Sequence, residues 1–515
     1  MSLSDVSTRV NDSLSYDQLL IDLSSPGRTG FSLPELPQDY RGVEAILPPS
    51  LLRKEPPDLP ELSEPEVVRH FIALSVKNHH IDKGLYPLGS CTMKYNPKVN
   101  EIAANLPGFT SAHPHSPVDF VQGTLEVLFE LQNLLAAISG MDAVTLHPAA
   151  GAHGEFTALL MMKAHHARNG EKRQNVIIPD SAHGTNPASV TLAGFTTVKV
   201  PSNQRGLVDV EKLAELCDRN TAGFMLTNPN TLGLFESDIE KIAAIVHDCG
   251  AILYMDSANL NALLGLVRPG DMTFDIVHFN LHKTFSTPHG GGGPGGGAIG
   301  VKSSLEPFLP VPVVGRKTRR QQGDGPASDG VAYYLDYNRP DSVGRLHGFY
   351  GNTAIAIRAY AYIRSLGPDG LKRIAAVAVI NANYLKEKLK DAYLLPYDAV
   401  CMHEFVLSAD KQLKQGVKAA QIGKRILDFG MHAPTIYFPL IVHEAMMIEP
   451  TESESRQSLD NFIGVMKRIA AEAESNPELV NSAPTKTPVG RLDEALAAKT
   501  LDVGWPARGG LAGKL

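Results

Sequence analysis

The chain has 515 residues, of which 43% are hydrophobic and 20% are charged. This composition is close to the average of globular proteins, and it excludes a chain that is disordered throughout. Lysine and arginine together number 48 and aspartate and glutamate 55, so the formal net charge is −7. A mildly acidic chain has no overall positive field that would hold nucleic acid, and we expect no nucleic-acid partner.

The cysteines and the apolar runs indicate the compartment. Four cysteines are present, and none lies within four residues of another, so the chain has no CxxC motif. The opening residues, MSLSDVSTRVND, lack the basic and apolar regions of a secretory signal. No apolar run approaches the roughly 18 residues that are needed to cross a membrane. We therefore expect a soluble, cytoplasmic protein that does not bind a membrane.

Residues 1–115 are predicted to form an extended, loop-rich N-terminal arm. Segments such as LPPSLLRKEPPDLPELSEPE and YPLGSCTMKYNP are dense in proline, which interrupts helices and central strands. One helix is predicted within the arm, in SEPEVVRHFIALSVKN. Its N-cap is Ser63, and its apolar stripe contains Val67, Phe71 and Leu74.

Residues 116–345 are predicted to form a large domain in which strands and helices alternate. A helix with apolar residues at helical spacing runs from Val121 to Ile138. The predicted strands after it are AVTL, NVIIP, TTVKVP, GFMLT, AILYM, FDIVHF and GAIGVK, and the predicted helices are EFTALLMMKAHHARNG, VDVEKLAELCDRN and SDIEKIAAIVHDCG. We expect Ser237 and Glu240 to form a capping box in the last helix. This alternation is typical of an α/β fold with a mainly parallel sheet covered by helices.

Residues 346–515 are predicted to form a smaller α+β C-terminal domain with an extended tail. Helical patterns are present in GNTAIAIRAYAYIRSLG, IAAVAVINANYLKEKLKDAY and ESRQSLDNFIGVMKRIAAEAE. The segments EFVLSA and IYFPLIV have the apolar character of strands. The tail from residue 483 onward is expected to be loosely ordered.

Candidate functional residues follow the strands of the large domain. In an open parallel sheet, ligands bind at the carboxyl ends of the strands. The small-residue turn HPAAGAHGE follows AVTL, and four later strands are followed by His183, by Asn228, by Asp256 and by the pair His282 and Lys283. The turn opens a helix, whose free N–H groups would suit a phosphate. The glycine-rich run 290–297 is expected to let the backbone approach a ligand closely.

Each of these residues alone also has a plain structural explanation. A lysine is usually a solvated charge, Asp256 could cap a helix, and His183 could be a loop histidine. As a set they occur in the order Gly151, His183, Asp256 and Lys283, at intervals of 32, 73 and 27 residues. Pyridoxal phosphate needs a phosphate cradle, an acid at the pyridine nitrogen and a lysine, and a ring that stacks on it is a common addition. The set resembles fold-type-I pyridoxal phosphate enzymes in order and spacing.

Longer strings narrow the resemblance to one family. They are YPLGSCTMKYNPKVNE (86–101), HPAAGAHGEFTALLMMKAHH (147–166), PDSAHGTNPASVTLAGF (179–195), LTNPNTLGLFE (226–236), MDSANLNALLG (255–265), NLHKTFSTPHGGGGPGGG (280–297) and TPVGRLDEALAAKTLDVGW (487–505). These strings are similar to the decarboxylating glycine dehydrogenase, the P-protein of the glycine cleavage system. The chain resembles the lysine-bearing half, which is subunit 2 of the split form.

The resemblance implies the fold, the activity and the partners. We expect a fold-type-I transferase fold and pyridoxal phosphate as the cofactor. The expected reaction is the decarboxylation of glycine, with release of carbon dioxide and transfer of the aminomethyl group to the lipoyl arm of the H-protein. The resemblance also implies subunit 1 as a partner in an α2β2 assembly.

The same resemblance implies roles for single residues. Lys283 matches the lysine that binds the cofactor covalently, Asp256 the acid that keeps the pyridine nitrogen protonated, and His183 the stacking histidine. The phosphate cradle is matched by Ala150, Gly151 and Ala152, and further cofactor-binding positions are Thr185, Asn228, Ala258 and His282. A loop near the active-site entrance is matched by Ser90, Cys91, Thr92 and Lys94.

Other functions are compatible with parts of the sequence. The lysine constellation alone would also suit another fold-type-I enzyme acting on glycine or a small amino acid, such as a hydroxymethyltransferase, an aldolase or an aminotransferase. A subunit that only stabilises a partner is a second alternative, which the presence of Lys283 and Asp256 disfavours. The segment GGGAIGVKS is not a P-loop, because Val301 separates the lysine from the glycine. The histidine pairs at 79–80, 113/115 and 165–166 are not predicted to bind a metal, and adjacent helical residues point in different directions.

Overall fold

The structure is a computed structural model that describes residues 19–55, 57, 59–289, 295–319 and 330–501. The chain divides into two compact units, Met1–His80 and Ile81–Leu515. The domain boundaries predicted at residues 115 and 345 stay predictions. Within the described residues, no helix combines the length and the apolar character that crossing a membrane requires.

In its described residues, the first unit consists mostly of loops and contains one long helix. Its helical elements are the 3-10 helices Leu20–Leu23, Val43–Ala45 and Pro49–Leu51 and the helix α2, Glu64–Lys77. Ser63 is the N-cap of α2, as predicted, and it forms a capping box with Glu66. The predicted apolar stripe of α2 is not a buried face, because Phe71 and Leu74 are exposed.

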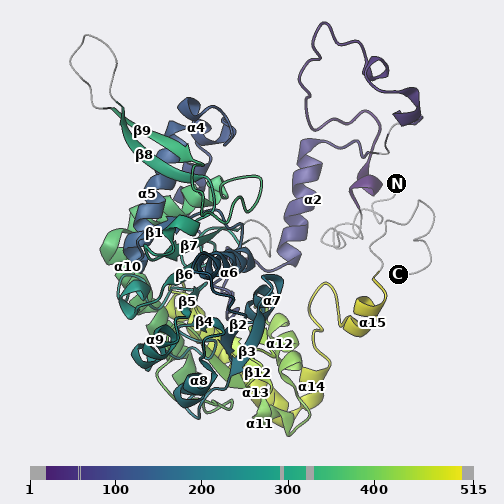
Figure 1. The fold of residues 1–515 in the computed structure, drawn as a ribbon. Helices are drawn as coiled ribbons and strands as arrows, with labels where there is room; N and C mark the ends of the chain where they lie inside the picture. The colour runs from purple at the N-terminus through teal and green to yellow at the C-terminus, as the bar shows by residue number, and fades with distance from the viewer. Residues whose placement is uncertain (1–18, 56, 58, 290–294, 320–329, 502–515) are drawn as a thin grey trace, which may run out of the picture. The chain divides into compact units, whose positions relative to one another are not determined.

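A seven-stranded sheet forms the centre of the second unit (Figure 1). Its strands are β1 Ala143–Thr145, β2 Asn175–Pro179, β3 Thr196–Val200, β4 Thr221–Thr227, β5 Ile252–Ser257, β6 Ile276–Asn280 and β7 Gly297–Val301. Their spatial order is β1-β7-β6-β5-β4-β2-β3, and β7 runs antiparallel to both of its neighbours while the other pairs are parallel. The mainly parallel sheet that the sequence predicts is confirmed.

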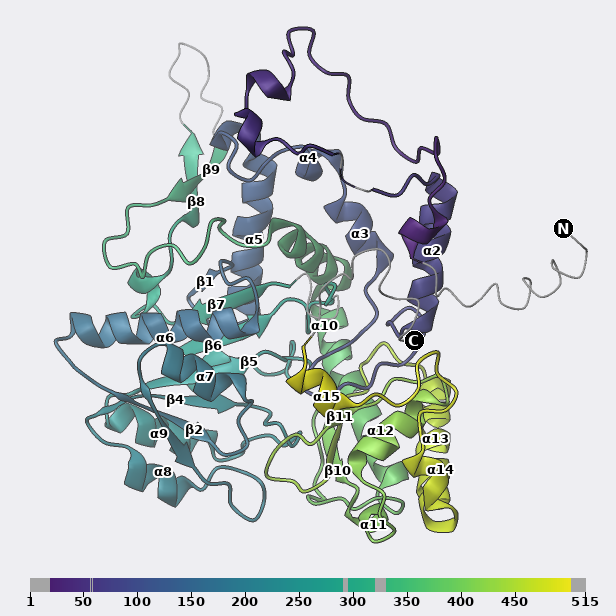
Figure 2. The ribbon, with the colours of Figure 1, turned by 90° about the vertical axis from the view of Figure 1, so that its right-hand side faces the viewer.

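Both faces of this sheet are buried beneath helices. Side chains alternate along β5, so Ile252 and Tyr254 pack into one apolar cluster and Leu253 and Met255 into another. The first cluster includes residues of α6 (Gly151–Arg168) and α7 (Thr185–Leu192), and the second includes residues of α5 (Gln122–Ser139), α8 (Val210–Leu216) and α9 (Ile239–Asp248). Figure 2 shows α6 and α7 on one face of the sheet and α8 and α9 on the other. Burial on both faces explains why the central strands are continuous apolar runs.

Some local predictions in the second unit differ from the structure. Helix α9 begins at Ile239 with Asp238 as its N-cap, so Ser237 and Glu240 do not form the predicted capping box. Asp238 instead pairs with Arg205 and Lys241, at 2.8 and 2.9 Å. The sequence prediction lacks α7 and the hairpin of β8 and β9, whose segments show no clear apolar period. The remaining elements before residue 340 are α3 Lys98–Ala104, α4 Pro107–Thr110, β8 Val313–Arg319, β9 Gly330–Asp336 and the 3-10 helices Val118–Phe120, Pro269–Met272 and Glu306–Phe308.

The helix α10, Thr353–Leu389, connects the sheet to the C-terminal part of the unit. Its path is interrupted at Gly367, where φ is 62° and ψ is −177°, next to Pro368. The segment before Gly367 contributes Ile355 to a core cluster of the sheet, and the segment after it contributes Leu385 to the core of the C-terminal part. The two helical segments that the sequence predicts on either side of this position are therefore confirmed.

The C-terminal part contains a three-stranded antiparallel sheet of order β10-β12-β11. Its elements are β10 Phe405–Ser408, α11 Asp410–Leu413, α12 Ala419–Leu427, β11 Thr435–Ile436, β12 Ala445–Ile448, α13 Arg456–Ser475, α14 Pro477–Asn481 and α15 Glu494–Lys499. The strand predicted in IYFPLIV is mostly wrong, because Tyr437 has a φ of 58° and Pro439 has no N–H to donate. The predicted tail contains α15, and its residues 502–515 lie outside the described residues.

Candidate active site

A cavity of about 280 Å³ lies at the carboxyl ends of β4, β5 and β6. It is lined by Ser90, Cys91, Gly151, Ala152, Glu155, His183, Thr185, Thr227, Pro229, Thr231, Asp256, Ala258, Asn259, His278, Asn280, His282, Lys283, His289, His403 and Glu404. This is the sheet edge at which the strand order predicts a ligand. The cavity brings together most of the predicted site residues, namely Gly151, Ala152, His183, Thr185, Asp256, Ala258, His282 and Lys283.

The N-terminus of α6 offers an anion-binding end beside the cavity. The helix has 18 residues and begins at Gly151, and its N-cap, Ala150, has no side chain that could accept a hydrogen bond. The N–H groups of the first turn are therefore left for a ligand, and the positive end of the helix dipole lies there. A β-carbon at Gly151 would lie 2.9 Å from Nδ2 of Asn280. Glycine keeps this turn open.

The glycine-rich run 290–297 is described only from Gly295 onward, and residues 290–294 lie outside the described residues. At Gly297 a β-carbon would lie 2.8 Å from the carbonyl oxygen of Ala150, and the N–H of Gly297 donates to the carbonyl of Pro148 at 2.8 Å. In the described part, glycine thus lets β7 approach the turn before α6. The close approach of this run to a ligand stays a prediction.

The carboxylate of Asp256 is positioned by the register of two strands. In the parallel pair β5 and β6, Asp256 lies opposite His278, and Nδ1 of His278 is 3.4 Å from Oδ1 of Asp256. Asn186 donates to Oδ2 from Nδ2 at 3.0 Å, and the N–H of Ala258 donates to Oδ1 at 3.0 Å. Burial by itself would raise the pKa of Asp256, but the contacts with His278, Asn186 and Ala258 lower it well below its usual range. Asp256 is therefore an anion at neutral pH.

His278 and Asn280 support this acid, and the sequence prediction missed both. They lie on the same face of β6 as the apolar Ile276, and Nε2 of His278 is 2.8 Å from Oδ1 of Asn280. Burial lowers the pKa of His278. Its contacts with Asp256, Glu155 and Asn280 together raise the pKa by more, so the net shift is upward. The signal was present in FDIVHFN, where polar residues alternate with apolar ones in an otherwise buried strand.

Glu155 is a second buried acid at the cavity that the sequence prediction missed. Its Oε1 accepts a hydrogen bond from Oγ1 of Thr185 at 2.6 Å, and its Oε2 accepts one from Oγ of Ser189 at 2.9 Å. Burial raises the pKa of Glu155, and the charge of Asp256 raises it further. The two acids therefore differ, since Asp256 favours the ionised form and Glu155 is pushed toward the protonated form.

His183 and Thr185 lie in the turn that starts α7. Nδ1 of His183 is 2.8 Å from Oγ1 of Thr185. Burial and the charge of Lys283 lower the pKa of His183, so the imidazole is neutral. The same two causes lower the pKa of His282 to about 3. Two uncharged flat rings, those of His183 and His282, therefore line the cavity together with Lys283.

Asn228 and Ala150 are the two predicted site residues that are not part of the cavity lining. Oδ1 of Asn228 accepts a hydrogen bond from the N–H of Glu236 at 3.0 Å, and its neighbours Thr227 and Pro229 line the cavity in its place. Ala150 is the N-cap of α6, next to the lining. Their predicted roles stay predictions.

Lys283 is half-buried just after β6 and contacts the predicted entrance loop. Its Nζ donates to the carbonyl oxygen of Ser90 at 2.7 Å. Ser90 has a φ of 64°, and its N–H donates to Oε2 of Glu404 at 2.7 Å. The next residue, Cys91, has its Sγ 3.0 Å from Nε2 of His289. The loop thus connects the lysine to an acid of the C-terminal part.

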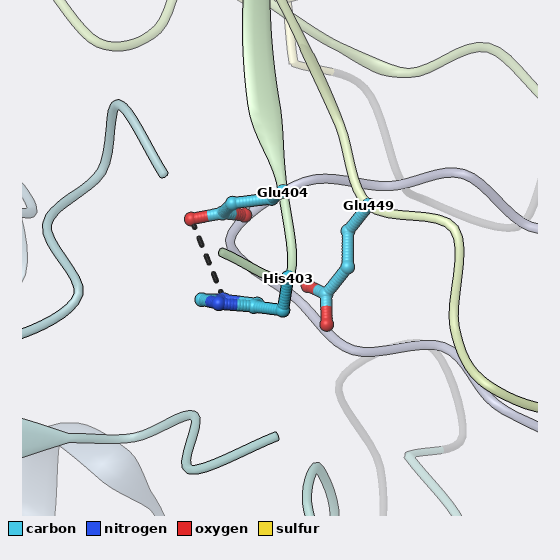
Figure 3. Close-up of side chains that lie close together, drawn as sticks. All are labelled: His403, Glu404 and Glu449. Carbon is cyan, nitrogen blue, oxygen red and sulfur yellow. Dashed lines mark ion pairs between the residues drawn. The ribbon is translucent and has the colours of Figure 1, made fainter. Parts of the chain in front are cut away.

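Three buried side chains of the C-terminal part, His403, Glu404 and Glu449, lie close together (Figure 3). Nε2 of His403 is 3.7 Å from Oε1 of Glu404, and one nitrogen or oxygen atom from each of the three residues lies within 4.8 Å of the others. His403 and Glu404 line the cavity. The sequence prediction missed this cluster. One oxygen of each acid already accepts a hydrogen bond, namely Oε2 of Glu404 and Oε1 of Glu449.

These residues fit pyridoxal phosphate. The open helix end at Gly151 suits a phosphate, the anionic Asp256 suits a protonated pyridine nitrogen, and the amine of Lys283 suits the aldehyde. All three line one cavity. The described lining therefore offers groups of the kinds that the cofactor requires, and the roles of these residues stay predictions.

The variant Gly151→Ala tests the cradle. The added β-carbon would lie 2.9 Å from Nδ2 of Asn280, so Asn280 must move, and its contact with His278 is disturbed. We expect the affinity for pyridoxal phosphate to fall about tenfold or more, which corresponds to roughly 1.4 kcal/mol. Titration of the apoprotein with the cofactor measures this. Gly464→Ala in α13 is the matched control, because its β-carbon would meet no atom of the described residues within 4 Å. An equal loss of affinity in both variants would contradict the role of Gly151 in the phosphate cradle.

Comparison with solved structures defines the class of protein. The crystal structure of a glycine decarboxylase (P-protein) of the glycine cleavage system, in inhibitor-bound form, has a TM-score of 0.69 at 21% identity and covers 83% of this chain and 94% of that chain. The glutamate decarboxylase of Lactobacillus brevis has a TM-score of 0.60 at 14% identity and covers 82% of this chain and 96% of its own. The cysteine desulfurase of Thermococcus onnurineus has a TM-score of 0.56 at 16% identity and covers 79% of this chain and 98% of its own. The fold is that of the fold-type-I pyridoxal phosphate enzymes, so the predicted fold class is confirmed.

Comparison of sequences defines the family. A model of the glycine cleavage system P-protein matches residues 41–326, and a model of the glycine dehydrogenase C-terminal domain matches residues 374–486. The probable glycine dehydrogenase (decarboxylating) subunit 2 of Listeria monocytogenes is 57% identical over 482 residues, which cover 93% of this chain and 96% of that protein. The protein of that name in Halalkalibacterium halodurans is 56% identical over 488 residues, covering 94% and 98%. The chain belongs to the glycine cleavage system P-protein family, as the sequence predicts.

Proposed function

We propose that this chain is the cofactor-bearing subunit of an enzyme that decarboxylates glycine and transfers the aminomethyl group to the lipoyl arm of the H-protein. The observation that carries the proposal is the convergence of Gly151, Asp256 and Lys283 on one cavity, in a chain 57% identical to proteins named glycine dehydrogenase (decarboxylating) subunit 2. Pyridoxal phosphate, when bound, supplies a ring that accepts the electron pair freed as carbon dioxide leaves.

The proposed roles of the chain's own residues follow from their charges. The first turn of α6 at Gly151 holds the phosphate, and Lys283 holds the cofactor covalently in the absence of substrate. Asp256, which His278 and Asn186 keep anionic, holds a proton on the pyridine nitrogen. The neutral ring of His183 stacks on the cofactor. Thr185, Asn228, Ala258 and His282 complete the proposed binding set.

The test of this function is the exchange of labelled carbon dioxide into glycine. We expect exchange that depends on lipoylated H-protein, because decarboxylation is reversible only while the aminomethyl group can return from the lipoyl arm. Another fold-type-I enzyme acting on glycine would not need the lipoyl protein. Aldol cleavage or amino transfer at comparable rates, with no exchange when lipoylated H-protein is added, would contradict the proposal.

We also propose a cytoplasmic α2β2 assembly with a second subunit. The relatives are named subunit 2, which supports a separate partner chain. Exposed apolar side chains on two helices also support a partner chain. In α2, Phe71 is 55% and Ile72 58% exposed, and in α3 Val99 and Ile102 are exposed as well. Apolar side chains gathered on one helix favour burial against another protein. The cytoplasmic location agrees with four free cysteines.

The isolated chain is expected to be poorly active and to gain activity with subunit 1. Partner binding would complete the site, which raises turnover as well as affinity. The measurement is the exchange assay with and without subunit 1, beside a mass determination. Combining Phe71→Ser with Ile72→Ser should weaken assembly about tenfold or more, whereas Leu192→Ser, an exposed leucine of α7, should leave it unchanged. Full activity of this chain alone, unaltered by subunit 1, would overturn the split assembly.

A further inference from the structure

The proposed reaction assigns no role to a buried pair of acids, Glu404 and Glu449. Their proximity comes from strand pairing, because β10 and β12 are antiparallel and Phe405 lies opposite Ile448. Glu404 directly precedes Phe405 and Glu449 directly follows Ile448, so extending the register by one residue places the two acids opposite each other. Both are almost fully buried, with exposed fractions of 3% and 1%.

Each carboxyl group is anchored by one oxygen. Oε1 of Glu449 accepts hydrogen bonds from Oγ1 of Thr92 at 2.6 Å and from Nδ2 of Asn259 at 2.8 Å, while its Oε2 is buried and has no partner among the described residues. Oε2 of Glu404 accepts the N–H of Ser90 at 2.7 Å. The anchored groups cannot turn away from each other without losing these bonds.

Burial and the repulsion between the two acids favour one proton on the pair at neutral pH, against the positive charges of Lys283 and Lys94. Burial and the charge of Glu449 raise the pKa of Glu404 to about 8, and burial raises the pKa of Glu449 to about 7 against the donors that hold it. The charged or titratable groups that face the pair are Lys283, Lys94, His403 and Cys91. Burial and Lys283 keep His403 neutral, and burial raises the pKa of Cys91. Two carboxylates this close and this buried do not both ionise readily.

We infer that Glu404 and Glu449 share one proton and that Glu404, which lines the cavity, exchanges it with the reacting groups. Glu404 reaches the site through Ser90, whose N–H it binds and whose carbonyl binds Nζ of Lys283. The inference rests on the proposed function for the identity of those groups. Glu404 is a proton carrier here, and Glu449 is a positioning residue that sets its affinity for the proton.

The proposed reaction needs such a carrier. Glycine arrives with an ammonium group, and its nitrogen must lose a proton before it can bond to carbon. The bond from the glycine carbon to its carboxylate then breaks, carbon dioxide leaves, and the carbon bonds to one lipoyl sulfur. The S–S bond breaks, its electron pair stays on the second sulfur, and that sulfur takes up one proton. A carrier that gives its proton to the thiolate and regains one from the ammonium group of the next glycine closes the balance, with the disulfide as the oxidant.

The first experiment observes the proton directly. Infrared difference spectra of the holoenzyme complex, titrated from about pH 5 to pH 9, report the carbonyl band of a protonated carboxyl group. We expect a band that disappears between about pH 7 and pH 8 in the native protein. In Glu404→Gln the step near pH 8 should be lost, and only the step of Glu449 near pH 7 should stay. Glu454→Gln is the matched control, because Glu454 is also a partly buried acid of raised pKa in the C-terminal part. Its carboxylate accepts a hydrogen bond from Ser458, away from the pair and from the cavity lining. The band should survive in this control.

The second experiment measures turnover against pH in the same complex. Glu404→Gln keeps the shape and an acceptor for Ser90 but cannot carry a proton, so kcat should fall about 100-fold or more with cofactor content unchanged. Glu449→Gln removes the charge that raises the pKa of Glu404. The alkaline limb of the plot of kcat against pH should therefore move to lower pH by about one unit. Glu454→Gln should retain the native profile.

Several results would overturn the inference. Both acids ionised at pH 6 in the infrared titration would do so, as would native turnover and pH dependence in Glu404→Gln. A divalent cation that copurifies with the native protein and is absent from Glu404→Gln would assign the cluster to a metal instead. If the native complex shows no exchange of carbon dioxide with glycine at all, the proposed function fails, and the infrared titration alone still decides whether the pair holds a proton.

Discussion

Replacing Lys283 by alanine is expected to abolish glycine decarboxylation while leaving the fold intact. Lys283 lies just after β6, half-buried at the cavity, and the hydrogen bond of its Nζ goes to the carbonyl of Ser90 at 2.7 Å. Loss of one such bond at a solvent-accessible cavity costs about 1 kcal/mol of stability. The amine itself has no substitute on the described lining of the cavity, so the loss in turnover should be several orders of magnitude.

Reduction with borohydride measures the assignment independently of turnover. It should fix pyridoxal phosphate to the native chain and not to Lys283→Ala, and digestion should recover the label in the peptide that contains residue 283. Lys302→Ala is the matched control, because Nζ of Lys302 also donates to a backbone carbonyl, that of Gly140, at 2.8 Å and lies outside the cavity. Label recovered on another lysine of the native chain would refute the role of Lys283.

The position of the site could be predicted because it follows from topology. In a parallel sheet the carboxyl ends of neighbouring strands share one edge, so His183, Asp256 and Lys283 had to converge once their strands were recognised. The structure places all three at one cavity with Gly151. The apolar runs of the strands were clear because both faces of the sheet are covered.

The supporting residues were harder to predict because their signals are weak or non-local. His278 and Asn280 were detectable in principle as polar residues alternating in a buried strand. The pairing of Glu404 with Glu449 depends on antiparallel strands whose partners lie far apart in sequence, and β12 itself was missed because the prediction placed a strand in IYFPLIV instead. Tyr437 adopts a positive φ there, which a tyrosine rarely does and which composition does not reveal.

Replacing Asp256 by asparagine is expected to lower turnover far more than it lowers cofactor content. Asparagine can still accept the N–H of Ala258, so the local backbone should keep its course. It carries no charge, however, and cannot hold a proton on the pyridine nitrogen. A hydrogen bond to a charged group contributes roughly 1.5–3 kcal/mol, and each 1.4 kcal/mol lost at the transition state lowers the rate about tenfold. We therefore expect a loss of about 10- to 100-fold or more in kcat.

The neighbours of Asp256 give this variant a second readout. His278 would lose the anion that raises its pKa, and Glu155 would lose the negative charge that raises its own, so both pKa values should fall. Imidazole resonances of His278 that titrate at lower pH in Asp256→Asn would report the lost charge without any reference to turnover. Asp180→Asn is the matched control, since Asp180 follows β2 in the same sheet and accepts the N–H of Ser202 at 3.1 Å away from the cavity lining. Both variants remove a carboxylate from the end of a parallel strand, but only Asp256→Asn removes it from the cavity. Equal turnover of the two variants would therefore show that the charge of Asp256 does not act in the reaction.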